Sequence, residues 1–146
     1  MGEQQIKAVR LYGFGGVLPF LLAAAGLHIT SGESHTFFAH AFLAYGAVIL
    51  SFIGAVHWGF ILKTEQVEQA GQLLAIGVIP SLVGWSGLLL PPLYTLILFT
   101  FAFPSLFIYE RFTQIGSLLP EWYMKLRLQL TTIVTLLHIV ALPGVA

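Results

Sequence analysis

Residues 37–62 read FFAHAFLAYGAVILSFIGAVHWGFIL and contain no Asp, Glu, Lys or Arg. A helix needs about 20 mainly apolar residues to cross the hydrocarbon core of a bilayer, so this stretch is long enough to span it. Four further stretches share this character and are separated by turn residues and charges. The five predicted spans are residues 11–30, 37–62, 72–90, 93–109 and 123–142. Because open sheets cannot span lipid, the sequence predicts an all-α membrane protein, a five-transmembrane-helix bundle in one membrane domain, residues 1–146.

The composition of the whole chain agrees with this interpretation. Charged residues make up 8% of the sequence, whereas an ordinary soluble domain has about 25%. Hydrophobic residues make up 58%, and the mean hydropathy is +0.91. Too few charges remain to cover a water-facing surface, which excludes a cytosolic enzyme, a nucleic-acid binder and a disordered tail. The chain has no cysteine and therefore neither disulfides nor thiolate metal sites, and we expect the lipid bilayer to be its main partner.

The basic residues predict an orientation. If the N-terminus is inside, all six Lys and Arg residues fall on the inner side. They are Lys7, Arg10, Lys63, Arg111, Lys125 and Arg127. The positive-inside rule then predicts an inner N-terminus and an outer C-terminus. Only ten residues precede the first predicted span, too few for a mitochondrial transit peptide, so we expect a multi-pass protein of the bacterial inner (cytoplasmic) membrane.

The second predicted span carries a ridge of small residues at every fourth position. These residues are Ala47, Ser51, Ala55 and Gly59. Positions four apart lie on neighbouring turns of a helix, and small residues there let another helix approach closely. We expect this ridge to serve helix packing.

The fifth predicted span carries a polar stripe instead. Its members follow spacings of four, four and three: Arg127, Thr131, Thr135 and His138. A charge at the bilayer centre costs at least about 2.5–3.5 kcal/mol, so the stripe is expected to face protein or water. Two interpretations stay open, namely hydrogen bonds between helices and the path of a ligand or ion.

Three prolines interrupt spans in their inner halves, at Pro19, Pro80 and Pro104. Each proline leaves a backbone carbonyl one turn earlier without its helical partner. Side chains that suit a ligand lie at the same depth, which suggests an inner-leaflet cavity. The candidate ligand-binding residues are His57, Trp58, Pro80, Ser81, Trp85 and Arg127. The alternative is that the prolines only kink their helices and that His57 is hydrogen-bonded near the interface.

Other histidines gather toward the opposite side of the membrane, where Glu33 also lies. They are His28, His35, His40 and His138. Imidazoles with a carboxylate can ligate a divalent metal, and paired histidines can hold haem. No two of them share an i, i+4 face, however, so we expect no metal, haem or other cofactor.

Catalytic groups are scarce in the sequence. There is no glycine-rich phosphate loop, nucleophile elbow or metalloprotease motif, so no catalytic residues are predicted. Glu110 is the carboxylate nearest to a span, at the inner end of the fourth, where Arg111, Lys63 and Arg127 are its candidate partners. No carboxylate lies clearly inside a predicted span, which counts against a proton pump.

Four segments resemble a known family. They are Gly16–Phe20 (GVLPF), Tyr45–Gly59 with its Gly-x-Val-His-Trp-Gly core, Gly77–Trp85 (GVIPSLVGW) and Trp122–Arg127 (WYMKLR). The chain resembles the domain of unknown function 3429 family of small inner-membrane proteins over nearly its whole length. This resemblance implies the fold but no settled activity. It marks His57, Trp58, Pro80, Trp85 and Arg127 as signature positions.

Three classes of function remain. Small size, short loops and missing catalytic groups favour a non-catalytic accessory or assembly subunit of a larger complex, with a membrane-protein partner or as a homo-oligomer. The alternative is a binding or transport protein for a small lipophilic or anionic ligand in the inner-leaflet cavity, with Arg127 as counter-charge. The third class is an enzyme or haem protein that uses His57. Of the three, the sequence favours the first.

Overall fold

The computed structural model describes residues 2–64 and 70–145, and within them it contains helices and no strand. The helices are α1 (Glu3–Gly15), α2 (Leu18–Ile29), α3 (Gly32–Lys63), α4 (Ala70–Gly87), α5 (Pro92–Phe112), α6 (Gln114–Leu118) and α7 (Glu121–Val145). Five helical segments are long and apolar enough to cross a membrane, with α1 and α2 together forming the first. The predicted five-helix bundle is therefore confirmed.

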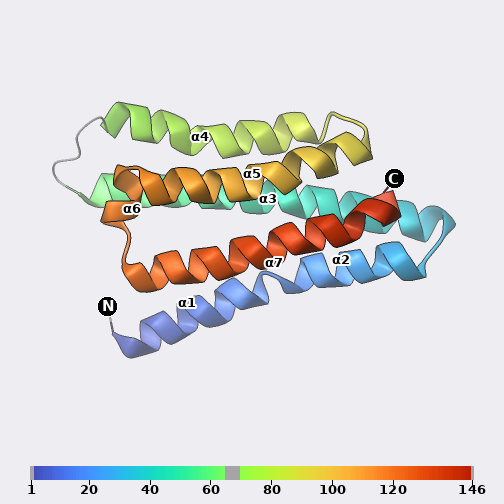
Figure 1. Ribbon diagram of the computed structural model, residues 1–146, viewed down its shortest axis with the longest axis horizontal. Coiled ribbons are helices and arrows are strands. Elements are labelled where there is room, and N and C mark those ends of the chain that lie inside the picture. Colours follow the sequence, from blue (N-terminus) through green and yellow to red (C-terminus); the bar gives the residue numbers. More distant parts are fainter. Residues whose placement is uncertain (1, 65–69, 146) are drawn as a thin grey trace.

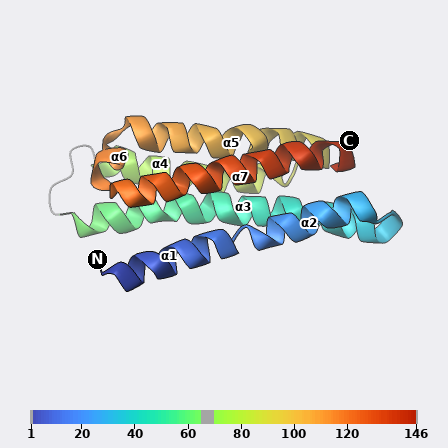
Figure 2. The same cartoon turned by 60° about the horizontal axis from the view of Figure 1, so that its bottom comes forward.

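The five segments lie side by side along one long axis, and the two chain ends lie at opposite ends of the bundle (Figures 1 and 2). One end holds the start of α1, the short helix α6 and the cationic side chains Lys63, Arg111 and Lys125, and we call it the basic end. The other end holds the α2–α3 and α4–α5 turns and the C-terminus, and we call it the histidine end after His28 and His35.

The first predicted span is two helices in the structure. Pro19 lies in the first turn of α2 and has no N–H for the carbonyl of Gly15, so the helix breaks there. The Tyr45 hydroxyl of α3 donates a hydrogen bond of 2.8 Å to the Gly16 carbonyl at this break. An α3 side chain thus holds the break in place.

Small residues bring α3 and α4 together, and Ala47 of the ridge expected from the sequence is one of them. A Cβ atom added to Gly54 would collide with the Gly77 backbone oxygen, and one added to Gly84 would lie 3.0 Å from the Ala47 oxygen. These positions are seven residues apart on each helix, a spacing that returns to nearly the same face, within about 20°.

Beyond Ala47, the predicted ridge turns away from α4. Positions four apart rotate by about 40° per step, so the ridge winds about 120° around α3 between its ends. Ala47 is buried and Ser51 is half-buried, whereas Ala55 and Gly59 are exposed. A Cβ added to Gly59 would meet nothing within 4 Å. Ala55 and Gly59 are thus not buried within the bundle, and a packing role for them stays a prediction.

The interior has two apolar parts. Toward the histidine end, aromatic rings dominate, and Phe20, Phe42, Phe99 and Phe103 are almost fully buried. Toward the basic end, a smaller cluster contains Ile61, Leu73, Ile115 and Leu119. Among the described residues, the buried His57, Glu110 and Arg127 lie on α3, α5 and α7.

Candidate functional site

Three side chains from three helices form a buried ion cluster. The Glu110 carboxylate of α5 accepts a hydrogen bond of 2.9 Å from His57 Nε2 of α3. Its second oxygen accepts bonds of 3.2 Å and 2.9 Å from Nε and Nη2 of Arg127 on α7. The three residues are 1–5% exposed. Ionic groups this deeply buried are stable only when they are paired and hydrogen-bonded, and here each charge has its partner.

Glu110 lies inside a spanning helix, contrary to the expectation that no carboxylate does. The fourth predicted span ends at residue 109, whereas α5 continues to Phe112. Hydropathy alone excludes a carboxylate from a span, but a charged partner on a neighbouring helix removes that penalty. Of the three candidate partners, the structure selects Arg127. The argument against proton-linked chemistry that rested on a missing acid therefore no longer holds.

The polar stripe of α7 faces the bundle interior. Arg127 Nη1 donates a bond of 3.3 Å to the hydroxyl of Thr131, one turn further along. Thr135 is half-buried, and its hydroxyl has no partner among the described residues. His138 is fully buried among the rings of Phe20, Phe42 and Phe103, and its Nδ1 bonds to the Val134 carbonyl at 2.8 Å.

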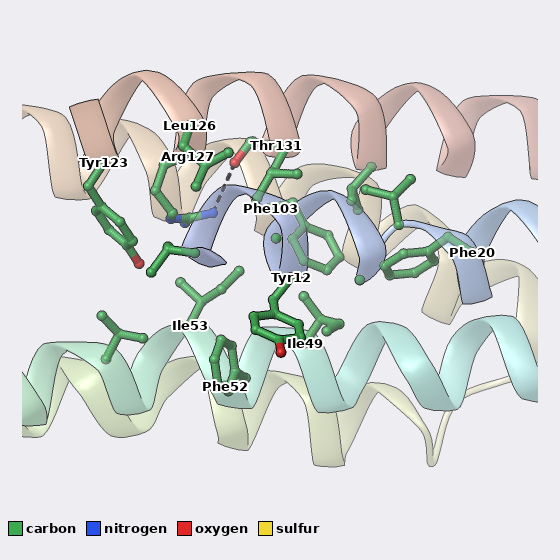
Figure 3. Close-up of a pocket in the computed structure, with 17 residues that line it drawn as sticks. Tyr12, Phe20, Ile49, Phe52, Ile53, Phe103, Tyr123, Leu126, Arg127 and Thr131 are labelled. Carbon is green, nitrogen blue, oxygen red and sulfur yellow. Dashed lines mark hydrogen bonds between the residues drawn. The ribbon is translucent and has the colours of Figure 1, made fainter. Parts of the chain in front are cut away.

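An apolar cavity of about 410 Å³ lies beside the ion cluster, between the α1–α2 pair, α3 and α7. Figure 3 shows Arg127 and Tyr123 of α7 at one end of this space, with Ile53 and Phe52 of α3 across from them and Tyr12 of α1 beside them. The other lining residues are mostly apolar: Val9, Gly13, Gly16, Val17, Phe20, Ile49, Val56, Phe103, Leu126, Leu130, Thr131 and Val134.

The six candidate ligand-binding residues do not form one site: two of them belong to the ion cluster, and the other four lie on α4 or bond to it. His57 and Arg127 meet through Glu110, and of the six only Arg127 lines the cavity. Trp58 donates a hydrogen bond of 3.0 Å to the Leu74 carbonyl of α4, so it links α3 to α4. Pro80 is buried against Gly54 at the same helix pair.

The remaining two candidates, Ser81 and Trp85, lie on α4, which contributes no residue to the cavity lining. Trp85 is 64% exposed, so its ring faces the surroundings of the bundle. Reasoning from depth alone placed all six residues at one level of the membrane. Depth in the membrane does not show that these residues lie on two different sides of α3.

Most cavity-lining residues were not identified from the sequence. Tyr12, Phe52 and Val56 are ordinary apolar or aromatic residues of spanning helices and carry no motif. One signal was present, since Gly13 and Gly16 lie close together ahead of the break at Pro19. Glycines beside a helix break leave room next to the backbone, and both of them line the cavity.

Two further histidines, His28 and His35, form hydrogen bonds with backbone carbonyls. His28 Nε2 lies 2.9 Å from the Val140 carbonyl, and His35 Nε2 lies 2.7 Å from the Gly144 carbonyl. These contacts tie the α2–α3 turn to the last turns of α7. His40 is exposed. The residues that the structure describes contain no group of three or more His, Cys, Asp or Glu able to hold a metal ion.

The chain matches a known protein family over most of its length. Residues 5–143 match the family described as "Protein of unknown function (DUF3429)". The chain belongs to this family. The match includes nearly all of α1 through α7 and thus every residue of the ion cluster and the cavity lining. The DUF3429 resemblance noted in the sequence is therefore confirmed, and the protein is a multi-pass membrane protein of this uncharacterised family.

A curated relative supports the same assignment. Transmembrane protein 69 of Xenopus tropicalis is 34% identical over 84 residues, which cover 57% of this chain. The aligned part spans about a third of the relative, 33% of its length. No solved structure matches the chain.

Proposed function

We propose that this protein binds a small lipophilic molecule with a hydrogen-bond-accepting head group inside the membrane. The cavity beside Arg127 carries this proposal. Its volume of about 410 Å³ lies within the range of about 300–1,000 Å³ that is usual for ligand pockets. Its lining is apolar apart from a few groups at one end, which is the arrangement that orients a ligand. The proposed role is binding, without a catalytic step.

Arg127 supplies the donors for such a head group. A guanidinium has five N–H groups. Two of those in Arg127 bond to Glu110 and one bonds to Thr131, which leaves two. A buried donor without a partner is costly, so an acceptor in the cavity would bind favourably there. The Tyr123 hydroxyl at the same end is a further candidate contact.

A ligand would enter sideways from the lipid. Helix α1 buries none of its residues, and its contacts with α3 are sparse compared with its contacts with α7. Tyr12 of α1 and Phe52 of α3 line the cavity and are also 78% and 66% exposed. The gap between α1 and α3 therefore connects the cavity with the surroundings of the bundle, where lipophilic molecules dissolve.

Photolabelling tests this proposal in native membranes. Diazirine-bearing dodecanoic acid and its methyl ester both carry an acceptor head on an apolar chain. With at least one of the two probes we expect adducts to concentrate on lining residues such as Tyr12 and Phe52. Val56→Trp fills the cavity and should reduce these adducts at least tenfold. The matched control is Val48→Trp, a lipid-facing site on the same helix that is 60% exposed and outside the lining.

The outcome that would overturn the proposal is equally specific. If adducts spread over lipid-facing residues such as Phe101 and Leu136, and both tryptophan variants behave like the wild type, the cavity holds no ligand. Folding of each variant is checked beforehand by its elution volume in mild detergent.

A second function, as an accessory or assembly subunit, is supported by a different observation. Ala55 and Gly59 are exposed on α3, and nothing lies within 4 Å of a Cβ added to Gly59. Small residues uncovered in a membrane helix suit contact with a helix of another protein or of a second copy. Native mass spectrometry after mild extraction should show a partner that Gly59→Leu releases. The control, Thr132→Leu at an exposed site of α7, should retain it, and a monomer in all samples would contradict this role.

We also infer that the protein lies in the cytoplasmic membrane of a bacterium with its N-terminus inside. The basis is the location of all six Lys and Arg residues on one side. The chain has no cysteine, so single cysteines report accessibility cleanly. An impermeant maleimide added to intact cells should label Ser34→Cys and leave Ser117→Cys unlabelled. The reverse pattern would overturn the orientation.

A further inference from the structure

The charge balance of the ion cluster restricts what the cavity can accept. Glu110 and Arg127 carry opposite charges, so with a neutral His57 the cluster sums to zero. A monoanionic ligand at Arg127 would therefore bring one uncompensated negative charge into a buried site. An unpaired charge in such surroundings is strongly unfavourable. An anion can bind tightly there only if the site gains a positive charge at the same time.

His57 is the group that can gain this charge. Its Nε2 bonds to the Glu110 carboxylate, which accepts hydrogen bonds only, so the proton of the neutral ring lies on Nε2. Nδ1 then carries a free lone pair, is buried, and has no partner among the described residues. A proton added at Nδ1 converts His57 to an imidazolium ion that stays paired with Glu110.

Glu110 is the other proton acceptor beside His57, and its two oxygens already accept hydrogen bonds, one from His57 and the other from Arg127. The charged side chains that face His57 are Glu110 of α5 and Arg127 of α7, and Tyr123 of α7 lies close to both. Helices α4 and α6 contain no Asp, Glu, His, Lys, Arg or Tyr. On α3 itself, the nearest charged residue is Lys63, six positions further along.

We propose that the cavity binds a single-chain fatty carboxylate and that each bound anion brings one proton onto Nδ1 of His57. The two free N–H groups of Arg127 match the two oxygens of a carboxylate, and the single proton site balances a single negative charge. The apolar lining receives the acyl chain. No covalent bond changes, since the proton comes from water and returns there when the ligand leaves. This inference rests on the proposed function, from which it selects the ligand and adds the proton.

Calorimetry of the full-length protein in detergent tests the proton count. Dodecanoate is titrated in two buffers of equal pH and different ionisation enthalpy, and the heat measured with Val56→Trp is subtracted as micelle partitioning. We expect about one proton taken up per bound anion, and a Kd that weakens up to tenfold per unit of rising pH. The methyl ester should bind with no proton uptake and with a Kd independent of pH.

Substitutions at two histidines test whether the proton binds to Nδ1 of His57. His57→Gln keeps an N–H donor for Glu110 but cannot accept a proton. We expect it to abolish proton uptake and to weaken dodecanoate binding at least tenfold, with methyl ester binding unchanged. His138→Gln is the matched control, a second buried histidine that packs among aromatic rings toward the histidine end, and should leave the proton count at one. If H57Q does not fold, nitrogen NMR of ring-labelled histidine in the wild type should show Nδ1 of His57 becoming protonated when dodecanoate is added.

The failures are distinguishable. Dodecanoate binding without proton uptake, or uptake that persists in H57Q because the ligand itself carries the proton, overturns the coupling. Binding of the methyl ester alone overturns the choice of a carboxylate while the proposed function stands. If neither probe labels the cavity, the proposed function falls together with this inference.

Discussion

The two ends of the bundle hold their polar side chains in different ways. Toward the basic end, His57, Glu110 and Arg127 come from three helices and bond to one another through side chains. Toward the histidine end, the rings of His28, His35 and His138 bond to backbone carbonyls of α7. Side-chain ion pairs depend on every partner being present, whereas a backbone carbonyl is always there. We therefore expect the first arrangement to be sensitive to single substitutions and the second to be tolerant.

The largest effect is expected from Glu110→Gln. This change leaves the Arg127 charge buried without a counter-charge and should lower the free energy of unfolding by about 3–5 kcal/mol. Titration with SDS in bicelles measures the loss. Adding Arg127→Gln to the same chain should restore much of the stability because no unpaired charge remains.

An exposed carboxylate at the start of α7 provides the control for this experiment. Glu121→Gln should change the free energy of unfolding by less than about 0.5 kcal/mol. If Glu110→Gln costs no more than Glu121→Gln, the ion cluster does not stabilise this end of the bundle and the contrast fails.

Two glycines of α3 differ in the group that an added Cβ atom would meet. A Cβ at Gly54 would collide with the Gly77 backbone oxygen, whereas one at Gly46 would first meet the Phe99 ring at 3.0 Å. A ring can shift slightly, but a helix backbone cannot, so Gly54→Ala should cost about 1–3 kcal/mol and Gly46→Ala less. The exposed Gly59→Ala should instead stabilise by up to about 1 kcal/mol through helix propensity. Equal losses at Gly46 and Gly54 would show that both interfaces adjust alike.

His57 and His138 allow the two kinds of hydrogen bond, to a side chain and to a backbone carbonyl, to be compared for the same residue type. His57→Leu removes a bond to a charged group on another helix, and we expect a loss of about 1.5 kcal/mol. His138→Leu removes a bond within its own helix and also a ring nitrogen, Nε2, that has no partner in the described part of the chain. Its effect should stay within about 0.5 kcal/mol, measured by the same SDS titration. A larger loss at His138 than at His57 would reverse the assignment.

Small effects are also expected at the C-terminal turns of α7. His28→Ala and His35→Ala each remove one hydrogen bond to a carbonyl, worth about 0.6 kcal/mol in a membrane protein. Hydrogen exchange of the amides near Val140 and Gly144 should become faster while the ion cluster is unaffected. His40→Ala serves as the control, since the His40 side chain is exposed. Unchanged exchange in both variants would mean that the two rings do not hold α7.

The fold could be predicted from the sequence because lipid leaves the backbone a single choice. Five apolar stretches must form helices, since a helix bonds all of its own N–H and C=O groups. The missing N–H of proline predicted an interruption at three positions, of which Pro19 lies at a helix break, whereas Pro80 and Pro104 lie inside continuous helices. The start of α1 at Glu3 was not predicted, because its support is polar. Gln5 accepts a bond from the Gly2 N–H at 2.9 Å, and Lys7 pairs with Glu3 at 2.9 Å.

The candidate site was predictable only in part. His57 and Arg127 stood out because a charge or imidazole in a span needs a partner. Placing Trp85 and Ser81 with them was a matter of depth, and the structure places both on α4, apart from the cavity. The residues that do enclose the cavity, such as Phe52 and Val56, are indistinguishable in sequence from lipid-facing ones.

The sequence by itself determined the number of spanning segments, their helical form and the presence of charges that require burial. The tertiary structure alone decided which way each helix faces. A spanning helix is apolar all round, so its sequence lacks the one-sided pattern that shows which face of a soluble helix is buried. The choice of Arg127 as the partner of Glu110, the contact of Gly54 with α4 and the cavity between α1, α3 and α7 all depend on that rotation.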